Sequence, residues 1–198
     1  MFTRTESFRQ YLSYYPLVSI LIAFTIFLFF LGLLPILPEG FLFEKGQGVN
    51  LYISSGEWWR LVTPIFLHSS FSHLLFNCFA LAIFGPPLER LLGSLTFTVF
   101  FLITGISANI ITFILQPPTY IHVGASGAIF GLLGFYLYLV LFQKNRLPTQ
   151  EVKMIYTLIG VGVLMTFIQP NINITGHLSG LATGLLLASL FIQNRLKR

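Results

Sequence analysis

The sequence predicts an all-α membrane protein: a bundle of six transmembrane helices whose first loop lies at the membrane interface. Two observations support this prediction. The chain of 198 residues is 55% hydrophobic and only 9% charged, whereas a soluble domain carries roughly 25% charged residues. So few charges cannot cover a water-facing surface, and the apolar residues form long runs that are typical of membrane spans. We expect one membrane domain over residues 1–198.

Six apolar runs define the expected spans, at 17–37, 70–88, 95–115, 126–142, 153–168 and 176–192. The first ends around Pro35 and Pro38, and a turn over 89–94 separates the second from the third. The last three are short for a hydrocarbon core of roughly 30 Å, which predicts local thinning of the membrane or helices that begin below its surface. We find no internal repeat, which disfavours an inverted-repeat transporter.

The segment 39–60 is expected to form a loop in the interfacial layer of the membrane. It holds few charges and ends on Trp58, Trp59 and Arg60. Indole rings favour the layer between hydrocarbon and water, so the two tryptophans indicate where this loop lies.

The basic residues indicate how the chain crosses the membrane. Six spans put both termini on one side, and nine of the eleven Lys and Arg residues fall there: Arg4, Arg9, Arg90, Lys144, Arg146, Lys153, Arg195, Lys197 and Arg198. Lys45 and Arg60 fall on the other side. Because basic residues concentrate in cytoplasmic loops, both termini are expected in the cytoplasm. We therefore attribute the net charge of +5 to the cytoplasmic segments of a membrane protein, and we expect no nucleic-acid partner.

Polar side chains inside a membrane are costly, so each needs a reason. His73 and Asn77 lie four residues apart near the start of the second span and share one helix face. Ser126 opens the fourth span, and His177 lies at the start of the sixth. The predicted topology puts all four near the outer ends of their helices, where one pocket would hold them.

Glycines repeat every four residues on two of these spans, at Gly127 and Gly131 on the fourth and at Gly180 and Gly184 on the sixth. This spacing is typical of helices that pack closely, and packing alone would explain it. A lone serine or histidine in a span is also often structural. Close approach of these two spans is nevertheless what a hydrogen bond of roughly 2.6–3.2 Å between the serine and the histidine would need.

Ser126 with His177 as general base would form a nucleophilic pair. The chain has no Asp, and its six glutamates fall outside the expected spans: Glu6, Glu39, Glu44, Glu57, Glu89 and Glu151. A dyad is therefore expected rather than a triad. The candidate oxyanion donors are the backbone N–H of Ser126 at a helix N-terminus, the amide of Asn77 and the ring of His73.

Neither a metal nor a cofactor is expected. His68 and His73 lack the His-Glu-x-x-His spacing of zinc proteases. Steps of five residues rotate His68, His73 and Cys78 around a helix by about 140° each, so the three do not share a face. His122 is interpreted as a loop residue and Cys78 as a packing residue.

Five motifs together resemble the rhomboid family of intramembrane serine proteases, in its six-span bacterial form. They run from about residue 58 to 184 and comprise Trp59-Arg60, His73-x-x-x-Asn77, Glu89-x-x-x-Gly93, Gly124-x-Ser126-Gly127 and Gly176-His177-x-x-Gly180-x-x-x-Gly184. No single motif is specific, but five in this order and spacing are. One departure is Gly176, where Ala is common in the family.

The resemblance implies a Ser126–His177 dyad, with His73, Asn77 and the Ser126 N–H as the oxyanion hole. It implies a bacterial plasma-membrane protein that cuts single-pass transmembrane proteins within or near their span on the outer side. The fifth span and the cap loop 169–175 would gate substrate entry. The alternative is a non-proteolytic rhomboid-like chaperone that binds unstable transmembrane helices. A small transporter has little support, because no intramembrane Asp, Glu, Lys or Arg is evident in the spans.

Overall fold

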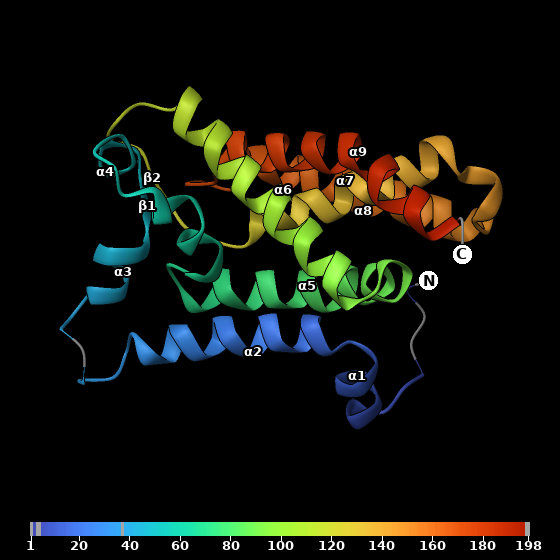
Figure 1. The fold of residues 1–198 in the computed structure, drawn as a ribbon, viewed down its shortest axis with the longest axis horizontal. Helices are drawn as coiled ribbons and strands as arrows, with labels where there is room; N and C mark the ends of the chain where they lie inside the picture. Colours follow the sequence, from blue (N-terminus) through green and yellow to red (C-terminus); the bar gives the residue numbers. More distant parts are fainter. Residues whose placement is uncertain (1, 3–4, 37, 197–198) are drawn as a thin grey trace.

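The computed structural model describes residues 2, 5–36 and 38–196 (Figure 1). Six long apolar helices form the fold: α2 (Pro16–Leu31), α5 (Phe71–Leu92), α6 (Ser94–Leu115), α7 (Ser126–Phe142), α8 (Thr149–Ile168) and α9 (Ile174–Leu196). The shorter elements are α1 (Phe8–Tyr14), α3 (Phe41–Gly46), β1 (Gly48–Val49), α4 (Asn50–Ser54), η1 (Trp58–Leu61), η2 (Thr63–Phe66), β2 (Ile121–His122) and η3 (Lys144–Arg146). The prediction of an all-α polytopic membrane protein is confirmed.

The helices differ in how well their length suits a membrane. Among the described residues, α5, α6, α8 and α9 are long and apolar enough to cross one, and α1 with α2 adds a fifth candidate if this pair, bent by 105°, is one span. The sixth apolar helix, α7, has only 17 residues. Most of its side chains are buried among the other helices. Because protein rather than lipid surrounds α7, its length need not match the bilayer.

Several expected boundaries shift in the structure. Helix α2 ends at Leu31, where the expected span ran to 37, and α8 begins at Thr149 instead of 153. Helix α9 begins at Ile174, so the cap loop is shorter than the expected 169–175. Helix ends are decided by caps and packing as well as hydropathy, which explains why the apolar runs misplace them.

The expected turn over 89–94 and the absence of glutamate from the spans were both wrong. Helix α5 continues to Leu92 and carries Glu89, which is only 2% exposed. The Glu89 carboxylate accepts hydrogen bonds from the backbone N–H groups of Leu17 (3.0 Å) and Val18 (2.9 Å), and from the Ser94 hydroxyl (2.6 Å). Burial is possible because the carboxylate caps the N-terminus of α2, where the helix dipole favours negative charge.

Helices α7 and α9 lie side by side (Figure 1), and among the described helices they make the most extensive contact. A side chain at Gly180 would collide with the backbone carbonyl of Gly127, and one at Gly184 with that of Gly131. The predicted close approach of the fourth and sixth spans is thereby confirmed. Helix α6 packs against both members of this pair.

The segment between α2 and α5 folds into short helices and a strand. Arg60 holds it together: its buried guanidinium bonds the Glu57 carboxylate at 2.6 Å and donates to the carbonyl oxygens of Gln47 and Glu44, both at 2.8 Å. Strand β1 pairs antiparallel with β2, opposing Gly48 to His122. This pairing ties the first loop to the chain that leads into α7.

Trp58 and Trp59 each expose more than half of their surface on this loop. The Trp59 indole N–H donates to the Lys45 carbonyl at 3.0 Å. Exposed indole rings are typical of the membrane interface. The interfacial location of this loop stays a prediction.

Candidate active site

Ser126 is the first residue of α7, directly after Ala125 at the N-cap position. The turn before it is shaped by Gly124, whose φ of 120° is a conformation that L side chains rarely adopt. The Gly124 N–H donates to the Pro64 carbonyl at 2.8 Å, which fixes the turn to η2. Ser126 thus lies at a helix N-terminus, where the first-turn N–H groups have no helical partner and favour an anion.

His177 lies in the first turn of α9 and is 7% exposed. Its ring stacks on Phe130, with centroids 4.1 Å apart and planes 17° apart. Phe130 follows Ser126 by four residues on α7, so both share one helix face. His177 therefore packs on the face of α7 that carries Ser126.

The helix backbones also meet at this end of the pair. The ideal Cβ position of Gly127 lies 3.6 Å from the carbonyl oxygen of Gly176, the residue before His177. Among the described residues, Ser126 and His177 are not hydrogen-bonded to each other, and the ring nitrogen Nδ1 is instead bonded to Thr166. Catalytic hydrogen bonds are often long in the absence of substrate and shorten in the reacting complex.

Thr166 is a contact that the sequence did not predict. Its hydroxyl oxygen lies 2.8 Å from His177 Nδ1 and donates to the Gly162 carbonyl at 2.9 Å. Thr166 belongs to α8 and is 2% exposed. A threonine within an apolar run gives no sign of its partner, because the contact depends on how α8 and α9 are rotated.

Asn173 holds the start of α9 in place. Its side-chain oxygen accepts from the Gly176 N–H at 2.8 Å, which is an N-cap arrangement, and its amide donates to the Thr112 hydroxyl of α6 at 3.0 Å. The side-chain amide of Gln116, the residue that follows α6, donates to the Thr175 hydroxyl at 2.6 Å. The first turn of α9 is therefore fastened to α6, and an Asn three residues before a helical Gly was the signal that could have predicted it.

His73 and Asn77 lie near the start of α5. The ideal Cβ position of Gly124 lies 2.6 Å from His73 Nε2, so the His73 ring covers the turn that leads to Ser126. His73 Nδ1 lies 3.2 Å from the Ser69 hydroxyl. The Asn77 amide donates to the His73 carbonyl at 2.9 Å, and its second N–H has no bond in the structure.

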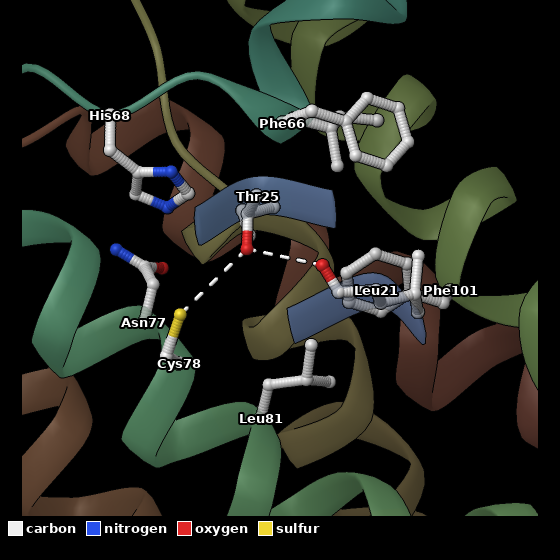
Figure 2. A pocket seen from close by; sticks show the side chains of 10 residues that line it. Leu21, Thr25, Phe66, His68, Asn77, Cys78, Leu81 and Phe101 are labelled. Carbon is white, nitrogen blue, oxygen red and sulfur yellow. Dashed lines mark hydrogen bonds between the residues drawn. The ribbon is translucent and has the colours of Figure 1, made fainter. Parts of the chain in front are cut away.

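His68 lies beside this site, facing a cavity of about 10 Å³ (Figure 2). Figure 2 shows Asn77, Cys78 and Thr25 on the other sides of this cavity. His68 is 2% exposed, and neither ring nitrogen makes a well-aligned hydrogen bond to another described residue, although the Phe66 backbone lies near the ring. Burial, together with the nearby His73 ring, lowers the pKa of His68 to about 4, so the ring is neutral near pH 7.

The structure brings His68 and His73 within 5.0 Å of one another, centroid to centroid. The thiol of Cys78 lies 3.7 Å from the Thr25 hydroxyl. Within the described ranges, no three His, Cys, Asp or Glu side chains are grouped as a metal site would need. His122 lies in β2, against Gly48, and its buried ring nitrogens have no hydrogen-bond partner among the residues that the structure describes.

The fold and this arrangement define a class of protein: an integral membrane protein of packed apolar helices, with a serine and a histidine at neighbouring ends of the two most closely packed helices. The model of the Rhomboid domain matches residues 55–194, which is most of the chain. The chain belongs to the rhomboid family.

Three relatives illustrate the range of the family. "Putative rhomboid protease YdcA" of Bacillus subtilis (strain 168) is 44% identical over 198 residues, which is 100% of both chains. "Rhomboid protease GluP" of the same organism is 40% identical over 144 residues, covering 73% of this chain and 28% of that protein. "Rhomboid-like protease 1" of Toxoplasma gondii is 30% identical over 164 residues, covering 80% of this chain and 56% of that protein.

Proposed function

We propose that this protein is an intramembrane serine protease that cleaves single-pass transmembrane proteins within or near their span. The observation that supports this most is the position of Ser126 and His177 at neighbouring ends of α7 and α9, with the His177 ring stacked on the α7 face that carries Ser126. The protease names of the full-length Bacillus subtilis relative and of GluP support the same reading.

In the proposed reaction, the Ser126 hydroxyl attacks the scissile carbonyl while His177 Nε2 accepts its proton. The Nδ1 side of the ring is occupied by Thr166, which leaves Nε2 for this role. The proton then passes from His177 to the leaving amine, and the N-terminal part of the substrate stays on the serine as an ester. Water, deprotonated by His177, hydrolyses this ester and returns the free serine.

The negative charge on the attacked carbonyl oxygen needs donors that are already in place. The Ser126 N–H has no partner within its helix and points out of the N-terminus of α7. The unbonded N–H of Asn77 and the His73 ring, which covers the Gly124 turn, are the proposed further donors. The Ser126 N–H belongs to the start of α7, and the Asn77 and His73 side chains belong to α5. The proposed oxyanion site is therefore assembled from two helices.

The substrate must unwind before it can be cut, because a transmembrane helix hides its amides in internal hydrogen bonds. Substrates with small or helix-weakening residues near the cut are therefore favoured. We place the cut on the outer side of a bacterial plasma membrane, with both termini of the enzyme in the cytoplasm, because most basic residues then lie in cytoplasmic segments.

The test is cleavage of a single-span reporter in proteoliposomes by wild type and by Ser126→Ala. We expect cleavage by wild type alone and a cut site, mapped by mass spectrometry, near the end of the span. Labelling by a fluorophosphonate probe is expected in wild type and lost in both Ser126→Ala and His177→Ala. Equal cleavage by wild type and Ser126→Ala would contradict the proposal, and a wild type that neither cleaves nor labels would favour the non-proteolytic chaperone.

A further inference from the structure

The last nine residues of α8, 160–168, include one fully buried side chain, and it is polar. The buried residues of this helix are Val152, Ile155, Ile159 and Thr166, and the first three lie in or near its N-terminal half. No atom lies within 4 Å of a Cβ built at Gly160. Thr166 is thus the one buried residue among the last nine of α8, residues 160–168, and it contacts His177.

The two hydrogen bonds at Thr166 decide which ring nitrogen of His177 carries a proton. A hydroxyl has one proton to donate, and the Gly162 carbonyl can only accept. Thr166 therefore donates to Gly162 and accepts from Nδ1–H of His177 at 2.8 Å. In a neutral imidazole only one nitrogen carries hydrogen, so Nε2 has its lone pair free.

The ring of His177 is held on a second side as well. Phe130 stacks against its face, at 4.1 Å between centroids. Stacking fixes the plane of the ring, while the Thr166 bond fixes its rotation within that plane and its tautomer. The two contacts together leave one orientation in which Nδ1 faces α8 and Nε2 faces away from it.

We propose that Thr166 is the positioning residue of the catalytic base: it holds His177 in the Nδ1–H tautomer, with Nε2 free to accept the Ser126 proton. This inference rests on the proposed function. In soluble triads an Asp performs this task, whereas this chain has no Asp. A hydroxyl orients the ring without placing a carboxylate among apolar helices, where a charge is costly.

The position of Thr166 also links the base to the placement of α8. Because Thr166 is the buried contact at the C-terminal end of the helix, a movement of this end that withdraws Thr166 also removes the hydrogen bond that orients His177. The base is then correctly oriented only while the C-terminal half of α8 lies against α9.

Three variants of the full chain test this inference. Thr166→Val has nearly the same shape but no hydroxyl, and Thr166→Ser keeps the hydroxyl. Thr157→Val is the matched control, because Thr157 lies on the same helix, is exposed, and within the described part of the chain its hydroxyl bonds only the Lys153 carbonyl. With the reporter in proteoliposomes, we expect kcat of Thr166→Val to fall at least about 10-fold with KM within about 2-fold, since orientation of the base acts in the transition state.

Thr166→Ser is expected to keep kcat within about 3-fold of wild type, and Thr157→Val to match it. A kcat of Thr166→Val equal to that of a wild type with Ser126-dependent cleavage would overturn the inference and leave the proposed function standing. A loss in Thr166→Val that Thr166→Ser does not restore would also count against it, because the hydroxyl would then not be the group that matters.

A second measurement does not depend on activity. In protein labelled with ¹⁵N-histidine, and also carrying Ser126→Ala, NMR reports which nitrogen of His177 bears hydrogen, with the signal assigned by its loss in His177→Ala. We expect the Nδ1–H tautomer with Thr166 and a shift toward Nε2–H in Thr166→Val. An Nε2–H tautomer in the presence of Thr166 would refute the inference even if the protein cleaves no reporter.

Discussion

Gly180 of α9 lies against the backbone carbonyl of Gly127 on α7, with no space for a side chain between the two helices. Gly127 directly follows Ser126, and Gly180 follows His177 by three residues. The contact that packs the helices is therefore the one that sets the distance between the candidate nucleophile and the candidate base. The small residues at this interface therefore affect both the packing of the bundle and the geometry of the candidate active site.

Gly180→Ala should accordingly lower both the stability of the protein and its cleavage activity. Its methyl group would meet the Gly127 carbonyl, and forcing extra atoms into a packed interface costs about 1–3 kcal/mol. We expect a lower thermal midpoint in detergent and at least a 10-fold loss of reporter cleavage, since small displacements of catalytic groups are costly. Gly160→Ala is the control: its Cβ would have open space on α8, and a midpoint as low as that of Gly180→Ala would contradict the explanation.

Glu89→Ala should destabilise the bundle at the end of α5 remote from His73. It leaves the N–H groups of Leu17 and Val18 without their acceptor, at a cost of about 2–4 kcal/mol for two buried donors. Thermal unfolding followed by circular dichroism measures the loss. The exposed Glu44 pairs only with its neighbour Lys45 within the described structure, so Glu44→Gln should leave the midpoint unchanged; equal effects of the two variants would refute this assignment.

Acid should destabilise the protein through its buried neutral histidines outside the spans. Burial lowers the pKa of His122 to about 4, against about 6.5 in an unfolded chain. The unfolded state therefore binds the proton first, so stability is complete above about pH 6.5, falls as pH drops below it and levels off below about pH 4. At pH 5 this amounts to about 2 kcal/mol for one such histidine.

The measurement is the thermal midpoint between pH 7.5 and pH 4.5 for wild type and His122→Phe. An aromatic ring that does not titrate should make the acid-induced decrease shallower. Parallel curves for the two proteins would show that His122 does not carry the effect.

Asn77→Ala tests the proposed oxyanion site. Removing one such donor lowers kcat about 10²- to 10³-fold, and we expect KM to change little because the charge exists only in the transition state. Steady-state kinetics in proteoliposomes separates the two constants. Asn109→Ala removes a buried amide that bonds the Leu61 carbonyl, and a kcat loss in this control as large as in Asn77→Ala would point to general structural damage.

Some elements were predictable because their cause is local. The bounds of α7 follow directly from the apolar run that begins at Ser126, and the glycine spacing predicted its contact with α9. Glu89 was wrongly assigned to a turn, because a charged residue at the end of an apolar run usually indicates one. Its hydrogen-bond donors, the N–H groups of Val18 and Leu17, lie 71 and 72 residues away in the sequence and could not be predicted from it. Asn173 was overlooked as a cap, although its position before a helical Gly was visible in the sequence.

By itself, the sequence determined the membrane class, the order of the apolar helices, the family motifs and the candidate Ser126 and His177, because hydropathy and residue spacing are properties of the chain read in order. Only the tertiary structure decided that Thr166 and Phe130 contact the His177 ring, that Glu89 caps α2, and that His68 faces a cavity beside Asn77. Those contacts depend on how neighbouring helices are rotated and how far they slide along one another. Packing sets these quantities between segments distant in the sequence, and no local pattern encodes them.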